Sequence, residues 1–246
     1  MSNAITLENV TVAYRRHPAL HHLSGAFASG SLSAVVGPNG AGKSSLLNAI
    51  TGAVPLSGGR ITLAPELRET VAYLPQRSAI DRQFPLRVDE LVQLGAWRQS
   101  GAFRGVTRAL REAAAEALAR VGLEGFGARL IGELSAGQFQ RLLFARLLLQ
   151  DARLILLDEP FNAVDERTVR DMLMLVQRWH GEGRTVIAVL HDLAQVRAHF
   201  PQALLLAREP IAWGETRTVL GADNLGRARM LSMAWDEAAP MCGRAA

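Results

Sequence analysis

Residues 37–45 have the spacing of a loop that binds phosphate groups. The stretch fits the pattern G-x-x-x-x-G-K-[ST]. It contains, in order, Gly37, Pro38, Asn39, Gly40, Ala41, Gly42, Lys43, Ser44 and Ser45. The apolar residues 32–36 before it predict a strand, and residues 45–50 after it predict the first turns of a helix. Glycines allow consecutive backbone N–H groups to turn inward around an anion at a helix N-terminus. Lys43 can then reach the β- and γ-phosphates, and the Ser44 hydroxyl can ligate Mg²⁺. The stretch predicts binding of a nucleoside triphosphate, and a glycine-rich turn without a ligand is the less favoured alternative.

Two adjacent carboxylates follow another predicted strand. Asp158 and Glu159 come directly after the apolar run 154–157, at the strand end where ligands bind in doubly wound sheets. A carboxylate at this place can hold Mg²⁺, usually through water, and the adjacent one can orient an attacking water as general base. The alternative is a solvated strand end, but Pro160 indicates a fixed turn.

Two more polar side chains follow predicted strands. His191 ends the predicted strand 185–190, where it could donate to a γ-phosphate or steady the attacking water. A surface histidine explains that position equally well. Gln76 follows the predicted strand 71–74 and could reach the metal or the water through its amide, although alone it is a weak signal.

A second candidate anion site precedes the predicted helix 138–149. Ser135 and Gln138 have the S-x-x-Q spacing of a capping box, and Gly137 keeps the helix N-terminus open. Because residues 37–45 already supply a phosphate site, this second one needs a different role.

Strands and helices alternate through most of the chain, which indicates a mostly parallel sheet covered by helices. The predicted strands cover residues 5–7, 10–14, 26–27, 60–63, 71–74, 154–157, 185–190 and 203–206. Two helices are expected between the later strands, at residues 166–180 and 193–200. Residues 77–150 have helical spacing instead, notably at 88–94 and 107–121, and form a helical inset.

Composition excludes few classes of protein. The net charge of +4 is compatible with an anionic membrane surface or nucleic acid, but an arginine-rich, solvated surface explains it more simply. The longest apolar runs are far shorter than the ~20 residues that span a bilayer, and no signal peptide is expected. Cys242 is the single cysteine, so no disulfide framework is expected, and we assign Cys242 no role.

Taken together, these residues resemble the ATP-binding subunits of ABC transporters over residues 4–225. The motifs of that family occur in its order. They are the Walker A loop at 37–45, the Q-loop glutamine Gln76, the signature at 134–138 extended by Gln140 and Arg141, Walker B at 154–158 with the catalytic glutamate Glu159, the D-loop at 162–165 and the switch histidine His191. Tyr14 falls where an aromatic ring of the family stacks on adenine.

The resemblance implies an α/β fold of the P-loop NTPase type. Its mostly parallel sheet is accompanied by an N-terminal antiparallel β subdomain and an α-helical inset. The expected organisation is one nucleotide-binding domain over residues 1–225, with a RecA-like core in 1–76 and 151–225 and a helical subdomain in 77–150. A weakly structured tail is expected over residues 226–246.

The resemblance also implies roles for single residues. Glu159, His191 and Gln76 are then catalytic in ATP hydrolysis, and Mg²⁺ is bound through Ser44, Gln76 and Asp158.

In this family two copies pack head to tail, and the signature of one closes over the ATP of the other. The resemblance therefore implies a homodimer in which signature residues act in trans and Asp165 is a dimer contact. The signature residues are Ser135, Ala136, Gly137 and Gln138. Three positions depart from the family pattern: Ala136 replaces the usual first glycine, Asn162 stands where serine is usual, and Val164 where leucine is.

Within the family, residues 76–85 and 159–165 are similar to the zinc and manganese uptake ATPases, and zinc is favoured. The similarity implies a separate membrane permease, a periplasmic metal-binding protein and a cytoplasmic position on the inner face of the cell membrane. The permease is expected to dock near the Q-loop and residues 77–104, where four apolar residues could form a notch. Alternatively, these four are core residues of the inset. The residues in question are Phe84, Leu94, Trp97 and Phe103.

Other functions remain as alternatives. The first is import of manganese or another substrate. A non-transport ABC ATPase of DNA repair or translation is the second, but its long coiled coils or paired nucleotide domains are missing, so no nucleic acid partner is expected. The third is another P-loop enzyme, such as a kinase or GTPase. The cluster of His17, His21 and His22 lacks a Cys or carboxylate ligand, and a structural or surface role is favoured over zinc binding.

Overall fold

The computed structural model describes residues 2–14, 17–76, 81–97, 105–162 and 164–233. Its centre is a six-stranded sheet in the order β5-β6-β7-β3-β8-β9, parallel except for the antiparallel edge pair β8–β9. These strands are β3 (Leu32–Val36), β5 (Val71–Leu74), β6 (Leu154–Asp158), β7 (Thr185–Val189), β8 (Gln202–Ala207) and β9 (Glu209–Glu215). The predicted α/β fold of the P-loop type is confirmed.

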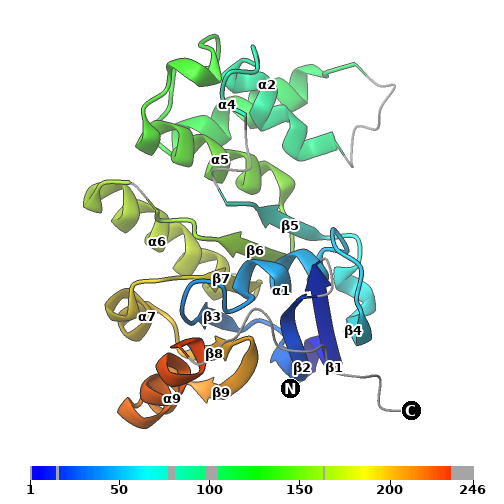
Figure 1. Cartoon of the computed structure of the whole chain (residues 1–246). Helices are drawn as coiled ribbons and strands as arrows, with labels where there is room; N and C mark the ends of the chain where they lie inside the picture. The colour runs from blue at the N-terminus through cyan, green and yellow to red at the C-terminus, as the bar shows by residue number, and fades with distance from the viewer. Residues whose placement is uncertain (1, 15–16, 77–80, 98–104, 163, 234–246) are drawn as a thin grey trace.

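A smaller antiparallel sheet stands beside the central one (Figure 1). Its order is β2-β1-β4, with β1 at Asn3–Tyr14, β2 at His17–Ala28 and β4 at Gly58–Leu63. The two strands predicted at 5–7 and 10–14 are one strand, β1, so that boundary was wrong. The register shifts between Leu7 and Val10, where Asn9 has a φ of 52° and forms an irregularity in the strand.

Two hydrophobic clusters cover the two faces of the central sheet. Alternate residues of one strand enter different clusters, as the two-residue period of a strand requires. Ile155 and Leu157 of β6 pack with the helical side, whereas Leu154 and Leu156 pack towards the small sheet and α1 (Lys43–Ile50). This two-sided burial explains why the parallel strands are continuous apolar runs in the sequence.

Helices fill the remaining layers (Figure 1). The group drawn above the sheet contains α2 (Val88–Gln93), the short η3 (Leu94–Ala96), α4 (Arg108–Arg120), η4 (Ile131–Glu133) and α5 (Ala136–Gln150). The others are η1 (Pro65–Leu67), α6 (Glu166–Gly181), α7 (Leu193–His199), α8 (Thr216–Val219) and α9 (Ala222–Met233). The group from α2 to α5 lies within the predicted inset, while its exact boundaries stay a prediction.

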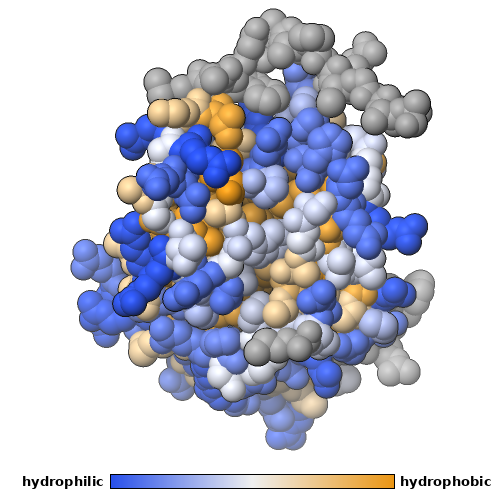
Figure 2. Space-filling model, turned by 90° about the horizontal axis from the view of Figure 1, so that it is seen from below, coloured by the Kyte–Doolittle hydropathy of each residue, from blue (hydrophilic) through white to orange (hydrophobic). Residues whose placement is uncertain are grey.

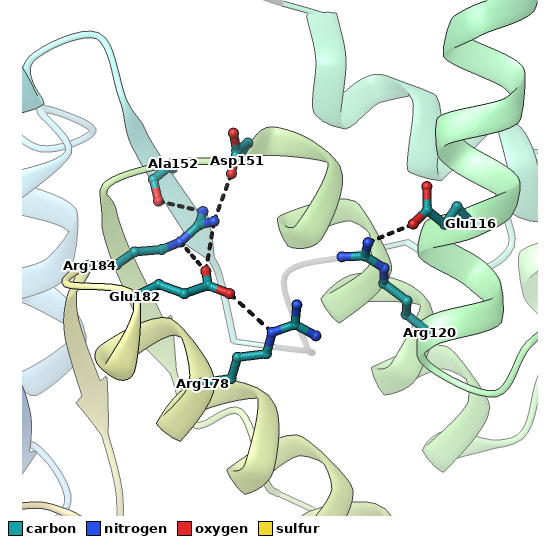
Figure 3. A network of polar contacts seen from close by, with 7 residues as sticks. All are labelled: Glu116, Arg120, Asp151, Ala152, Arg178, Glu182 and Arg184. Carbon is teal, nitrogen blue, oxygen red and sulfur yellow. Dashed lines mark hydrogen bonds and ion pairs between the residues drawn. The ribbon is translucent and has the colours of Figure 1, made fainter.

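Arg184 joins the end of α5 to the turn between α6 and β7 (Figure 3). Its guanidinium lies 2.7 Å from Asp151 Oδ1 and 2.9 Å from Glu182 Oε2, and it donates to the carbonyl of Ala152 at 3.1 Å. Arg178 of α6 also donates to Glu182. Because the Arg184 side chain is mostly buried, we expect these contacts to hold the C-terminal end of α5 against the turn between α6 and β7.

Three expectations from the sequence need correction. Residues 226–233 belong to α9, so that part of the predicted tail is helical, and the strand β9 was not predicted at all. The side chains of Phe84, Leu94 and Trp97 are exposed, so a core position is wrong for these three, while Phe103 lies outside the described residues.

On the face shown in Figure 2, the described hydrophobic residues form separate patches between hydrophilic ones.

Candidate active site

The loop between β3 and α1 has a backbone that only glycine fits at two points. Gly37 has a φ of 150°, and a Cβ there would lie 2.0 Å from the carbonyl oxygen of Leu206. Gly42 has a φ of 89°, and a Cβ there would lie 2.2 Å from the carbonyl oxygen of Ala19. Gly42 is the N-cap residue of α1. Because it has no side chain, it accepts no hydrogen bond from the N–H groups of the first turn. This is the geometry of a helix N-terminus that binds an anion.

Lys43 lies inside this loop. Its side chain is 6% exposed, and Nζ donates to the carbonyl oxygens of Gly37 and Pro38 at 2.9 Å each. Burial lowers the pKa of Lys43, while the charges of Glu159 and Asp158 oppose that shift. The ammonium group is thus held at the centre of the loop, close to both predicted carboxylates.

Ser44 and Asp158 meet beside the loop. Ser44 Oγ donates to Asp158 Oδ1 at 3.0 Å, and Tyr73 Oη lies 3.5 Å from Asp158 Oδ2. Burial raises the pKa of Asp158, and the hydrogen bond from Ser44 opposes this. A hydroxyl and a carboxylate so close together are the hard oxygen ligands that Mg²⁺ prefers, so these two residues fit the ion.

Glu159 accepts hydrogen bonds from three side chains. Its Oε1 lies 2.5 Å from His191 Nε2, while Gln76 Nε2 and Asn162 Nδ2 donate to Oε2 at 2.8 and 2.5 Å. Burial alone would raise the pKa of Glu159, but the hydrogen bonds from His191 and Gln76 and the charge of Lys43 lower it overall. The carboxylate is therefore ionised at neutral pH, as a general base must be.

The structure brings Gln76 and His191 to Glu159, a contact that the sequence did not predict. The predicted roles of His191 at the γ-phosphate or the water and of Gln76 at the metal or the water stay predictions. The structure places the Gln76 amide on this carboxylate and not on the pair of Ser44 and Asp158, so a Gln76 contact to Mg²⁺ stays a prediction. Asn162 was noted in the sequence only as a departure from the family pattern, and its contact with Glu159 was missed. Its position three residues after Glu159, across a proline turn, was the available signal.

The signature segment, residues 134–138, begins α5 with the predicted capping box. Ser135 Oγ accepts from the Gln138 N–H at 3.2 Å, and Gln138 Oε1 accepts from the Ser135 N–H at 2.9 Å. Ser135 is exposed, and Ala136 and Gly137 are half-buried. Among the described residues, the side chains of Ser135 and Gln138 each accept from the backbone N–H of the other residue and not from the loop at 37–45. The second predicted anion site therefore lies apart from the first within one copy of the chain.

Two further predicted residues lie at element ends. Tyr14 ends β1 with its ring about half exposed, available to a ligand. Asp165 is the N-cap of α6, where its Oδ1 accepts from the Thr168 N–H at 2.9 Å. Hydrogen bonds from Thr168 lower the pKa of Asp165. A Cβ added to Gly137 would lie 3.1 Å from Asp165 Oδ2, so the signature and the D-loop are neighbours.

Comparison with known proteins agrees with this fold and site. The family model for ABC transporters matches residues 20–162. A manganese transport system ATP-binding protein, MntB of Listeria monocytogenes, is 38% identical over 85% of this chain and 88% of its own length. A zinc transport system ATP-binding protein, TroB of Treponema pallidum, is 38% identical over 92% of this chain and 86% of its own length.

Solved structures that are similar to this chain also come from ABC transporters. A metal-chelate type ABC transporter in an inward-facing conformation is 28% identical with a TM-score of 0.82, covering 93% of this chain and 90% of the other. A dimeric bacterial ABC transporter cassette is 27% identical with a TM-score of 0.75, covering 87% and 99%. A P-loop core together with a signature segment at the start of a helix defines an ATPase of the ABC class. The chain belongs to the ABC transporter family, as one of its ATP-binding, ATP-hydrolysing subunits.

Two features of membrane and metal proteins are absent from the described residues. No helix among them is long and apolar enough to cross a membrane. They also contain no group of three or more His, Cys, Asp or Glu residues placed to hold a metal ion, the described histidines of β2 included.

Proposed function

We propose that this chain hydrolyses ATP to drive uptake of a divalent metal ion through a separate membrane permease. The observation that carries the catalytic part is geometric. His191 and Gln76 hydrogen-bond the Glu159 carboxylate. Glu159 directly follows Asp158, which accepts from Ser44 beside the loop that holds Lys43. Water attacks the γ-phosphorus, the bond from that phosphorus to the β–γ bridging oxygen breaks, and Glu159 accepts the proton of the water. ADP and phosphate are the products.

The neighbouring residues hold this arrangement. Lys43 binds the β- and γ-phosphates, and His191 and Gln76 keep the Glu159 carboxylate oriented and charged. Ser44 and Asp158 would hold Mg²⁺, which when bound neutralises charge on the phosphates. Tyr14 would stack on the adenine.

The substitution Glu159→Gln tests the catalytic part. Glutamine keeps the size and the acceptor oxygen but cannot take a proton, so we expect ATP binding to persist and turnover to fall by about 10²-fold or more. Binding is measured by a fluorescent ATP analogue, turnover by phosphate release, and the assembly by gel filtration with ATP and Mg²⁺. A trapped dimer is expected. Wild-type turnover in the variant would remove Glu159 from this role.

The identity of the transported metal ion is the more specific part of the proposal. Zinc is the first candidate, as for the TroB relative, and manganese is the second, as for the MntB relatives from Listeria and Bacillus. A deletion strain should grow poorly in zinc-limited medium and recover with added zinc. Recovery by manganese alone would select the alternative. A periplasmic metal-binding protein that delivers the ion to the permease is part of the proposal.

Exposed apolar side chains near the helical group support a permease partner. Leu94 and Trp97, at the end of α2 and η3, are 42% and 53% exposed, and Phe84 is 61% exposed. Leu94 and Trp97 are three residues apart at η3 and so lie on one side of it, and adjoining exposed apolar side chains are typical of a protein contact. We propose that the permease docks here and holds the chain at the inner face of the membrane. Trp97→Glu should leave ATP turnover of the isolated chain unchanged and abolish its retention by the co-expressed permease.

A further inference from the structure

Gln140 is a buried polar residue on an otherwise apolar side of α5. Its side chain is 3% exposed, and Leu143 and Phe144, which follow on the same side of the helix, are 1% and 0% exposed. The Nε2 atom donates to the carbonyl oxygen of Pro160 at 2.7 Å. Burying an amide is costly unless it is hydrogen-bonded, so this contact must hold Gln140 and Pro160 together in the folded chain.

The acceptor lies in the turn that carries the catalytic carboxylate. Pro160 follows Glu159 directly, and Glu159 itself has a left-handed backbone with a φ of 51°. The N–H of Asn162 donates to the carbonyl oxygen of Glu159 at 3.3 Å and closes the turn. Proline also restricts the backbone here. A displacement of the Pro160 carbonyl therefore moves the backbone that aims Glu159.

The donor lies on the helix that begins with the signature segment. Gln140 follows Ala136 by one helical turn, so a shift of the signature moves Gln140 with it. The next residue makes a parallel link, because Arg141 Nη2 donates to Thr168 Oγ1 at 3.2 Å and to Asp171 Oδ2 at 2.6 Å. Two consecutive residues of α5 thus hold both ends of the segment from Pro160 to Thr168.

We propose that Gln140 is a positioning residue that links the two ATP sites of a dimer. The inference rests on the proposed ATPase function and on the head-to-tail dimer that the family resemblance implies, in which the signature of one copy closes over the ATP of its partner. Binding of that ATP moves α5, and Gln140 transmits the movement to the catalytic turn of its own chain. Glu159 at one site is then aimed correctly only when the other site is filled. Gln140 touches no substrate in this scheme.

The substitution Gln140→Met tests the link, because methionine keeps the volume and removes the donor. We expect turnover to fall about tenfold at saturating ATP, the size of effect that coupling residues give, with an unchanged KM and a Hill coefficient near 1. The wild-type Hill coefficient should exceed 1, since two linked sites bind cooperatively. Thermal unfolding is measured in parallel.

Thr216→Val is the matched control. Thr216 is also buried, and its Oγ1 donates to the carbonyl oxygen of Phe200, so this variant loses the same kind of bond far from the catalytic turn. Both variants should unfold at a somewhat lower temperature, but only Gln140→Met should change turnover and the Hill coefficient. Equal kinetics in the two variants, or a wild-type Hill coefficient of 1, would overturn the link.

Two additions keep the test decisive. Should Gln140→Met fail to fold, Gln140→Asn retains the amide but is too short to reach Pro160, and it should show the same kinetic change. The double variant Glu159→Gln, Gln140→Met should still form the ATP-dependent dimer, because the link acts after closure. A wild-type chain that neither hydrolyses ATP nor dimerises would refute the proposed function itself, a result separate from failure of the link.

Discussion

Lys43 and Asp158 are the charged side chains that are buried in the described part of the chain. Burial raises the pKa of Asp158 and lowers that of Lys43. Each shift means that the charged form is less stable in the folded chain than in water. We therefore expect the nucleotide-free site to oppose folding, and a triphosphate with Mg²⁺ to remove that opposition.

Asp158→Asn should stabilise the nucleotide-free chain against unfolding and abolish its further stabilisation by Mg²⁺ and ATP. Asparagine can still accept from Ser44, while the buried charge is gone. Lys43 is the weakest influence on the Asp158 pKa, so loss of its attraction offsets little. We expect the unfolding temperature without nucleotide to rise by about 2–4 °C at pH 7, the shift that about 1 kcal/mol gives at this chain length. The gain from added Mg²⁺ and ATP should disappear, as scanning calorimetry would show.

The pH dependence of this gain has a definite sign. A carboxyl whose pKa is raised by folding destabilises the folded state above that raised pKa, where it is ionised in both states. The penalty shrinks as the pH falls through the raised pKa and is gone below the ordinary value of 3.8, where both states are protonated. The difference between Asp158→Asn and wild type should therefore be largest at neutral pH and shrink in acid. A difference that grows in acid would contradict the buried-charge explanation.

At the scale of elements, α5 is held at both ends. Gln140 and Arg141 attach its first turns to the catalytic turn and α6, and Arg184 attaches its C-cap residue, Asp151. A movement of the helix that begins with the signature is therefore passed to the core at both of its ends.

Arg184→Met should weaken the C-terminal attachment of α5. It removes contacts to Asp151, Glu182 and the Ala152 carbonyl from a side chain that is 21% exposed, so we expect a loss of about 1–3 kcal/mol in the free energy of unfolding. Arg178→Met is the control, because that side chain is 61% exposed and its pair with Glu182 contributes under about 1 kcal/mol. Urea unfolding of both variants measures the difference. Similar losses would show that the network does not act as an anchor.

The elements that the sequence predicted best are those with local signals. The loop at 37–45 has its own glycine pattern, the capping box of α5 is defined by Ser135 and Gln138, and β6 is a continuous apolar run. Such signals depend on neighbours in the chain, so they can be recognised without the fold.

The missed features depend on residues far apart in the chain. β9 has Pro210 and Gly214 and no clear alternation, and it is a strand because β8 pairs with it. The residues around Gly25 give no signal for a glycine in the sequence, but its φ is 153° and a Cβ there would lie 2.5 Å from the ring of Trp213. The contact of Gln140 with Pro160 likewise spans 20 residues and cannot be inferred from either segment alone.

At the scale of the whole molecule, the two predicted phosphate-binding elements lie apart within one chain. Within one chain, the loop at 37–45 faces Asp158 and Glu159, whereas the signature lies beside Asp165 and Thr168. A head-to-tail dimer, the proposed assembly, joins the loop of each copy to the signature of its partner. Each complete ATP site then requires two chains.

Mixing two inactive variants tests this assembly. Ser135→Asp keeps an N-cap for α5 but places a negative charge before the partner's triphosphate, and Glu159→Gln removes the base. A mixed dimer has one site in which both defects meet and one site that is intact. When the variants are combined before ATP is added, half of randomly formed dimers are mixed and each has one intact site, so independent sites would restore about a quarter of wild-type turnover. The Gln140 link lowers this about tenfold, because the intact Glu159 belongs to the chain whose signature is defective, so we expect a recovery of about a few per cent. Mixing Glu159→Gln with the double variant, which has no intact site in any pairing, should restore none. Absence of recovery in the first mixture would mean that each chain closes its own site, because a signature that acts within its own chain leaves both partners defective in every pairing.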